Sequence, residues 1–528
     1  MGGQSSHVVD FGARAFYSRY SSLPMEKIMS RQVAILHGWS DNSDSFRPLA
    51  KFLKKQGYQA VPIFLGDYIS LRDDVNIDDV AKRMEEVVRA KMARPKTARD
   101  HLAKEFDLVV HSTGGLVARR WISSNYANRS CPVKNLLMLA PANFGSKLAH
   151  IGRSMLGRIA KGWRTGFETG EEMLYALELG SRFQWELAEA DLLVDPESSA
   201  GETQFYGPDH VRPFVIVGTH PYPGLAEKLT NENGSDGTVR VTAANLNAEG
   251  ITIDFSGAPE NLLKPKLSLW KKRGGESNEF PLAVLPDRTH GSIVNPDEPG
   301  LARKKDTQDR LGQLIVQALS VNTAKQYAKV RDDWSVVTEA TRGLAGSSKA
   351  AQTNRNGFFK KRGAPAEYFH EYYQVNVRVE DEFGEPIQDY FLSFMPKQKQ
   401  HWYSLKKSFT PSGMFFHEEV LEDVHKHRRD ISHRTLFIDR FDLMREGGFY
   451  SQLKKPDKDK ELQVTVSAAD PGDRIAYFTR DAALRRGLVK IHQKLAPENR
   501  WLRRHRTHMV KVIVPRAADP DIFTLKRG

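Results

Sequence analysis

One short stretch, residues 106–121, constrains the fold of this chain most: FDLVVHSTGGLVARRW. Its first half is rich in branched apolar residues and predicts a buried strand, whereas its second half predicts a helix. Ser112 lies between them, followed by Gly114 and Gly115, and such small residues permit a sharp turn. A strand that leads directly into a helix is typical of parallel sheets covered by helices. The stretch therefore predicts that Ser112 is lifted above the end of a strand.

The same alternation of strand and helix patterns continues from about residue 31 to residue 322. Further apolar strands are predicted in QVAILHG, YQAVPIFL, VKNLLMLAP and PFVIVGT. Runs that are apolar throughout suit strands buried on both faces, as in a mostly parallel sheet with helices on both sides. A chain of 528 residues is too long for one domain. We therefore expect an α/β catalytic domain at 31–322, preceded by an N-terminal extension at 1–30.

Two further regions have a different character. Residues 145–210 form a long insertion with helical patterning, which predicts a cap over the site, either a mobile lid or a fixed cover. Residues 323–365 contain a small, polar and basic stretch and are expected to form a linker. Residues 366–528 alternate apolar and polar positions between turns, which predicts an antiparallel β-sandwich-like domain.

The turn at Ser112 is close to the Gly-x-Ser-x-Gly pattern that presents a nucleophilic serine. Here the pattern is Val110-His111-Ser112-Thr113-Gly114, so valine replaces the first glycine. Gly115 supplies a second small residue that lets the helix pack closely. We predict that Ser112 is a nucleophile, and the alternative is a serine that only caps the helix.

A serine nucleophile requires a base and an orienting acid, which in this arrangement follow it in chain order. Asp236 lies in a Ser-Asp-Gly-Thr-Val turn beyond the strand PFVIVGT and is the predicted acid. His290 follows the apolar segment LAVLP and is the predicted base. Asp287 is a rival acid three residues before it.

An oxyanion hole requires two backbone N–H groups aimed at the developing charge. Thr113 and Trp39 are predicted to supply them, with His37 and Gly38 shaping the loop after the first strand. No second ligand stands near His37 at a metal-binding spacing, so we expect no metal and no cofactor.

The catalytic half resembles the bacterial lipase and GPI inositol-deacylase-like branch of the α/β-hydrolases. The resemblance lies in LMLAPANFGS, in LELGSRFQWELAEADLL and in FVIVGT with the later SDGTV, and it covers roughly residues 31–320. It implies an esterase in which Ser112, Asp236 and His290 match the triad positions. It also suggests carboxylic esters, often lipid esters, as substrates.

A formal net charge of +13 implies an anionic partner, and we found no nucleic-acid-binding motif. The insertion interleaves apolar residues with basic ones, which suits peripheral contact with an anionic membrane and favours phospholipid over triacylglycerol. The basic residues are Arg153, Arg158, Lys161 and Arg164. The C-terminal domain offers a basic segment suited to a membrane, a glycan or a protein partner, and the alternative is a solvated basic face without a partner.

The same candidate residues are compatible with several other functions. The hydrolase fold can serve as an inactive binding scaffold, and an acyltransferase or thioesterase would use the same triad. We found no secretory signal or transmembrane segment, and the chain has one cysteine, so we expect a cytoplasmic protein. Export by a signal-independent route, as in a type VI-type lipase effector, is a minor hypothesis.

Overall fold

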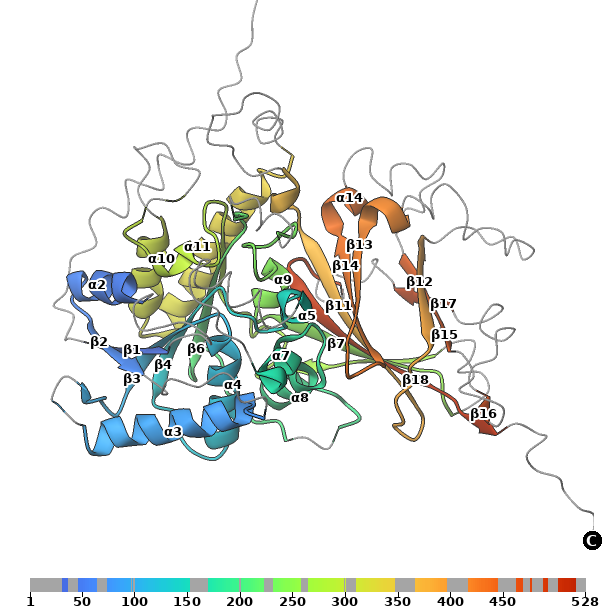
Figure 1. Ribbon diagram of the computed structural model, residues 1–528, viewed down its shortest axis with the longest axis horizontal. Helices are drawn as coiled ribbons and strands as arrows, with labels where there is room; N and C mark the ends of the chain where they lie inside the picture. The colour runs from blue at the N-terminus through green and yellow to red at the C-terminus, as the bar shows by residue number, and fades with distance from the viewer. Residues whose placement is uncertain are drawn as a thin grey trace, which may run out of the picture.

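The computed structural model consists of two units, each built on its own main sheet (Figure 1). It describes residues 31–36, 46–63, 74–95, 97, 100–151, 170–198, 201–222, 231–257, 265–298, 300, 310–346, 366–396, 416–444, 462–468, 475–476, 488–491 and 502–518. Within this part of the chain, no helix has the length and apolar character needed to cross a bilayer.

The first unit contains a sheet of six strands in the order β10-β6-β4-β3-β1-β2, and every neighbouring pair is parallel. The strands are β1 (Gln32–Leu36), β2 (Gln59–Ile63), β3 (Phe106–His111), β4 (Val133–Leu139), β6 (Arg212–Gly218) and β10 (Leu282–Leu285). All six residues of β3 are buried, as expected for a central strand covered on both faces. The predicted parallel α/β sheet is confirmed.

Helices cover both faces of this sheet, because alternate strand residues point to opposite sides. Ala34 packs in one core with Trp121, whereas Ile35 packs in the other core with Trp334. The first layer contains α3 (Ile77–Ala93) and α4 (Gly114–Asn125), and the second contains α2 (Arg47–Lys55), α10 (Arg310–Leu319) and α11 (Ala324–Arg342).

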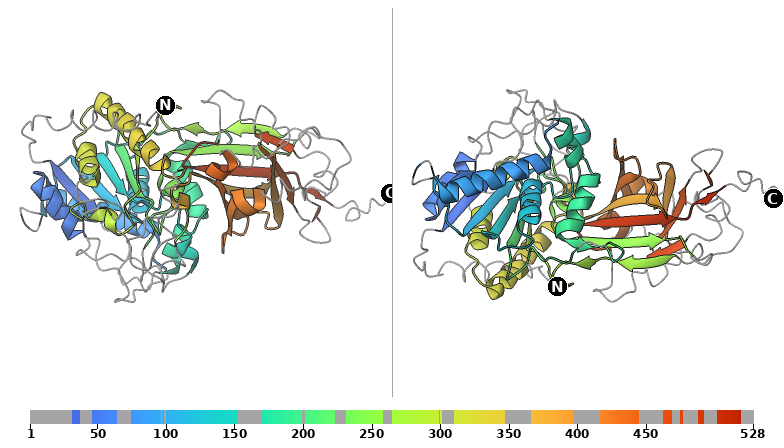
Figure 2. Two further views of the ribbon diagram at one scale, coloured as in Figure 1. Left: turned by 90° about the horizontal axis from the view of Figure 1, so that it is seen from above. Right: turned by 90° about the horizontal axis from the view of Figure 1, so that it is seen from below.

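The insertion between β4 and β6 is helical where it is described. It contains α5 (Leu148–Ile151), α7 (Glu171–Leu177), α8 (Arg182–Asp191) and the short strand β5 (Leu193–Val194), which pairs with β9 (Lys271–Lys272). Both views in Figure 2 place α7 and α8 at the junction of the two units. Arg153, Arg158, Lys161 and Arg164 lie outside the described residues.

The second unit is built on a six-stranded sheet in the order β13-β14-β11-β18-β7-β8. Its strands are β7 (Ala248–Asp254), β8 (Lys266–Leu269), β11 (Tyr372–Asp381), β13 (Leu421–Lys426), β14 (His433–Asp439) and β18 (Arg506–Val514). The expected C-terminal β-rich unit is present, but its main sheet is mixed, because β18 runs parallel to both β11 and β7. Period-two alternation shows which faces are buried but carries no information on strand direction.

Smaller elements complete the second unit and its connections. An antiparallel sheet contains β12 (Tyr390–Pro396), β15 (Leu462–Ala468) and β17 (Leu488–Ile491), and β16 (Ile475–Ala476) pairs with β19 (Ala517–Ala518). The short helices are α9 (Val241–Ala244), α14 (Arg440–Met444), the 3₁₀ turns η4 (Ser292–Val294) and η5 (Ala366–Phe369), and the π turn η7 (Phe416–Val420).

Two segments belong to a different unit from the one expected from the sequence-based domain boundaries. Residues 248–269, expected in the catalytic domain, supply β7 and β8 to the second sheet. Residues 324–342, expected in the linker, form α11, which packs on the first sheet through Tyr327, Val330 and Trp334. That apolar stripe is narrow within an otherwise polar helix, so composition alone masks it.

The two faces of the second sheet differ in chemistry. Tyr373, Val375 and Val377 of β11 point into the unit's own apolar core. Gln374, on the opposite face, donates from Nε2 to the carbonyl oxygen of Phe144 in the first unit at 3.1 Å. The two units therefore meet at a buried interface that contains hydrogen bonds between them.

Candidate active site

Ser112 lies at the junction of β3 and α4 in a strained conformation. Its φ is +54°, in the left-handed region that is costly for residues other than glycine. A Cβ atom at Gly115 would lie 2.8 Å from Cβ of Pro141, so a larger residue there would displace the chain after β4. Val110 is fully buried in β3 opposite Leu36 and Met138. The valine is thus accommodated as a core strand residue, with the sharp turn following it.

The structure brings Ser112, His290 and Asp236 together. His290 Nε2 lies 3.0 Å from Ser112 Oγ, and His290 Nδ1 lies 2.9 Å from Asp236 Oδ2. A carboxylate only accepts hydrogen bonds, so Nδ1 carries the proton and Nε2 is free to accept from the serine hydroxyl. This is the hydrogen-bonding order that serine nucleophiles require.

The Asp236 carboxylate is fully buried and held by its own turn. Its second oxygen, Oδ1, accepts from the backbone N–H groups of Thr238 and Val239 at 3.0 and 2.8 Å. Its backbone carbonyl accepts from the N–H of His290 at 2.9 Å. Asp236 therefore contacts His290 through both its side chain and its backbone.

The rival acid Asp287 occupies a different place. A Cβ atom at Gly300 would overlap its carboxylate, so that carboxylate packs directly against the Gly300 backbone. The carboxylate that accepts the hydrogen bond from His290 Nδ1 is that of Asp236.

The predicted oxyanion residues are described only in part. Thr113 is buried and immediately precedes α4, where N–H groups at a helix start favour negative charge. His37, Gly38 and Trp39 lie outside the described residues.

His111 has a contact that its predicted role as a turn residue did not include. Its Nε2 donates to the carbonyl oxygen of His290 at 3.0 Å, and the two rings lie 4.6 Å apart. Burial, followed by the neighbouring His290, lowers the pKa of His111 well below its usual value. His111 is therefore neutral and links the strand before Ser112 to the loop that carries His290.

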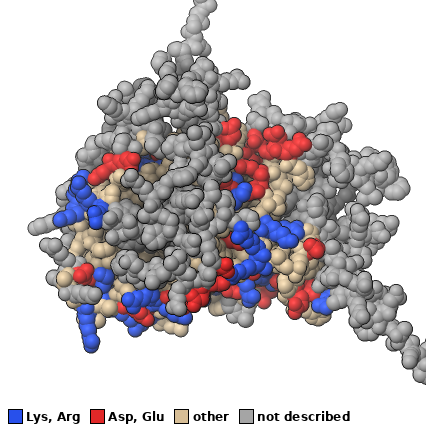
Figure 3. All heavy atoms as spheres, in the orientation of Figure 1, with Lys and Arg blue, Asp and Glu red and all other residues tan. Residues whose placement is uncertain are grey.

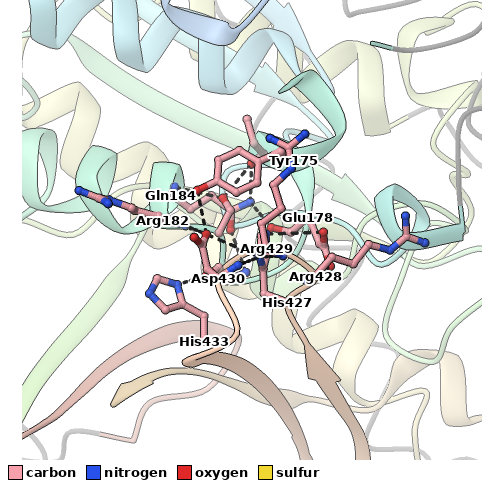
Figure 4. Close-up of polar contacts among 12 residues, drawn as sticks. Tyr175, Glu178, Arg182, Gln184, His427, Arg428, Arg429, Asp430 and His433 are labelled. Carbon is pink, nitrogen blue, oxygen red and sulfur yellow. Dashed lines mark hydrogen bonds and ion pairs between the residues drawn. The ribbon is translucent and has the colours of Figure 1, made fainter. Parts of the chain in front are cut away.

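A second group of polar residues fastens the insertion to the second unit (Figure 4). Glu178 accepts from His425 Nε2 at 2.9 Å, and Asp430 accepts from the Tyr175 hydroxyl and the Arg182 backbone N–H, both at 2.8 Å. Sequence reasoning missed these residues, since nothing local to either segment indicates that residues that lie 247 to 255 positions apart meet.

One group among the described residues has side chains suited to a metal ion: His370, Asp439 and Asp442. His370 Nδ1 already donates to Asp439 Oδ2 at 2.6 Å, and Asp439 Oδ1 accepts from the Asp442 N–H at the start of α14. These hydrogen bonds give the three residues a structural role, because they hold the start of the short helix α14 in the second unit.

The described surface carries both positive and negative side chains. On the face in Figure 3, Lys and Arg side chains lie among Asp and Glu side chains. The basic excess of the sequence is therefore not gathered into one uniform patch there.

No family model and no curated protein sequence matches this chain. Among solved structures, phospholipase PlaB from Legionella pneumophila is similar over 94% of this chain and 96% of that one, with a TM-score of 0.69 and 24% sequence identity. A second structure of PlaB, in complex with thio-NAD, has a TM-score of 0.68, 24% identity and coverages of 94% and 97%.

The chain has the α/β-hydrolase fold. The likeness to PlaB extends over the second mixed sheet as well as the hydrolase sheet. A lipase from Bacillus licheniformis in its propeptide form is also similar, over 88% of this chain and 96% of that one at 12% identity. Its TM-score of 0.32 is too low to support any argument.

Proposed function

We propose that this α/β-hydrolase is a serine ester hydrolase that acts on a lipid ester. Ser112 is the nucleophile, His290 the general base and Asp236 the acid that orients His290. The observation that carries the proposal is the 3.0 Å contact between Ser112 Oγ and His290 Nε2, backed by the 2.9 Å contact to Asp236.

In the proposed reaction, His290 Nε2 takes the hydroxyl proton as Ser112 Oγ attacks the ester carbonyl carbon. The backbone N–H groups of Thr113 and Trp39 stabilise the resulting oxyanion. Protonated His290 then gives its proton to the leaving alcohol, and the Ser112 acyl ester is hydrolysed by water in a second, similar step. Asp236 stays ionised throughout and stabilises the charged imidazole.

We propose a phospholipid as the substrate, in preference to a triacylglycerol. The likeness to a protein that is itself a phospholipase supports this choice, because it extends over nearly the whole of both chains. The narrower resemblance to the lipase and GPI inositol-deacylase-like branch agrees with it. Contact of the insertion with an anionic membrane, a protein partner for the second unit and export of the protein remain predictions.

The test compares wild type with Ser112→Ala on p-nitrophenyl esters of increasing acyl length and on phospholipid vesicles. We expect kcat/KM to fall on the order of 10⁴-fold, because a triad nucleophile is lost. Ser123→Ala, on the far part of α4, is the control and should retain wild-type rates. Equal, negligible hydrolysis by wild type and Ser112→Ala would instead favour an inactive binding scaffold.

A further inference from the structure

The chain between Asp236 and His290 leaves the hydrolase unit and returns to it. After the Asp236 turn it forms α9, runs through β7 and β8 of the second sheet, and comes back as β10. In Figure 1, α9 lies beside β11 of the second sheet. Asp236 and His290, which are hydrogen-bonded to each other, thus lie at the two ends of a segment that contributes strands to the other unit.

Arg240 lies at the start of this segment, immediately before α9, and its side chain is 3% exposed. Its guanidinium carbon lies 4.2 Å from the ring centre of Phe437 and 4.8 Å from that of Tyr372, which come from β14 and β11. Nη2 contacts Glu422 at 3.2 Å and Glu232 at 3.3 Å. Two aromatic faces and two carboxylates therefore surround a buried cation, as its desolvation requires.

Arg240 is also part of the Asp236 turn. Ser235 and Arg240 form an antiparallel bridge, and the N–H of Val241 donates to the carbonyl of Gly234 at 2.9 Å. Gly234 has a φ of +65°, and a Cβ atom there would lie 2.6 Å from the ring of Tyr372. The ring that stacks on Arg240 thus also abuts the backbone two residues before Asp236.

We propose that Tyr372, acting through Arg240 and Gly234, is a positioning residue for Asp236. The second sheet then sets the geometry of the acid and is required for the chemical step, beyond any role in holding substrate. This inference rests on the proposed function.

The experiment compares two neighbouring tyrosines of β11 that point to opposite faces. Tyr372→Leu removes the ring against the Asp236 turn, whereas Tyr373→Leu removes a similar ring from the second unit's own core. We expect Tyr372→Leu to lower kcat by about 10- to 100-fold with KM within about twofold, because small misplacements of catalytic groups have effects of this size. Tyr373→Leu should lower the melting temperature comparably and leave kcat within about twofold of wild type.

A double-mutant cycle separates positioning from general loosening. In an Asp236→Asn background the effect of Tyr372→Leu on kcat should shrink to about twofold or less, since the residue through which it acts is already gone. A full multiplicative loss in that background, or equal kcat losses in Tyr372→Leu and Tyr373→Leu, would overturn the inference. If Ser112→Ala and Asp236→Asn themselves leave kcat unchanged, it is the proposed function that fails.

Discussion

At the scale of single residues, the site depends on a few close approaches of backbone to backbone. Ser112 has a left-handed conformation that costs on the order of 1–3 kcal/mol, and it persists because the surrounding strands and helix leave no alternative. The carbonyl oxygen of Ser112 accepts from the N–H of Ala142 at 3.1 Å. The strained turn is thereby joined to the chain that follows β4.

The close approach at Gly115 leads to a prediction about substitution. Alanine favours helices by about 1 kcal/mol over glycine, yet its Cβ would lie 2.8 Å from Pro141. Overpacking costs of roughly 1–3 kcal/mol should outweigh that gain, so Gly115→Ala should destabilise the protein and lower kcat about tenfold. Urea unfolding and ester hydrolysis measure the two effects.

Gly201→Ala is the matched control, since nothing lies within 4 Å of a Cβ atom at that position. It should leave stability within about 0.5 kcal/mol of wild type. A Gly115→Ala protein that is more stable than wild type and has normal kcat would contradict the prediction. It would mean that the chain around Pro141 moves to make room for the added methyl group at little cost.

At the scale of elements, a buried ion pair joins the helix after Ser112 to the insertion. Arg119 of α4 and Asp191 of α8 are fully buried and make two hydrogen bonds of 2.9 Å, while Arg119 Nη1 donates to the carbonyl of Asn143. The Tyr206 hydroxyl also donates to Asp191. This pair holds α8 and the chain after β4 against α4.

Removing one partner of this pair should be strongly destabilising. Asp191→Ala leaves the Arg119 cation buried without its partner, so we expect a loss of roughly 3–5 kcal/mol in the free energy of unfolding. Glu186→Ala, which breaks the exposed pair with Arg182 on the same helix, should cost less than about 1 kcal/mol. Guanidinium unfolding curves of both variants measure these free energies of unfolding. If Asp191→Ala and Glu186→Ala both lost less than about 1 kcal/mol, water would have to reach Arg119 in the Asp191→Ala protein.

At the scale of the whole molecule, buried histidines lie both at the junction of the two units, where His433 Nδ1 donates to the carbonyl oxygen of Gly180, and inside the second unit, where His508 lies. His508 of β18 is fully buried, its Nδ1 donates to the carbonyl of Gln374, and its Nε2 accepts from the N–H of Arg503. A second proton would have to sit on Nε2, facing that N–H. Burial accordingly lowers the pKa of His508 to about 3, and burial likewise lowers the pKa of His433.

This arrangement predicts that acid destabilises the protein. The unfolded chain binds a proton at His508 near pH 6.5, whereas the folded chain does so only near pH 3. Stability should therefore fall as the pH drops through this interval, with His508 alone contributing about 2 kcal/mol between pH 7 and pH 5. His508→Gln keeps a donor and an acceptor without titrating, so it should flatten the pH dependence of the unfolding free energy.

His101→Gln, at an exposed position, provides the comparison and should leave the pH dependence as in wild type. An unchanged slope in His508→Gln would mean that other groups account for the acid sensitivity.

Local patterns in the sequence predicted much of the hydrolase unit. The parallel sheet followed from apolar runs that alternate with helical ones, and the sharp turn at Ser112 followed from the small residues beside it. Asp236 and His290 were singled out by their positions after later strands. Strand direction in the second sheet and the membership of β7 and β8 in it were not predictable, because alternation carries no partner information.

Local sequence patterns account for the elements and for the chain order of the candidate residues, because periodicity, small side chains and turn chemistry act over a few neighbouring positions. The folded chain is needed to show which aspartate meets His290, and that Ser112 lies beside a histidine 178 residues away. It alone shows that the second sheet packs against the Asp236 turn through Arg240. These contacts depend on where distant strands return, which no local pattern records.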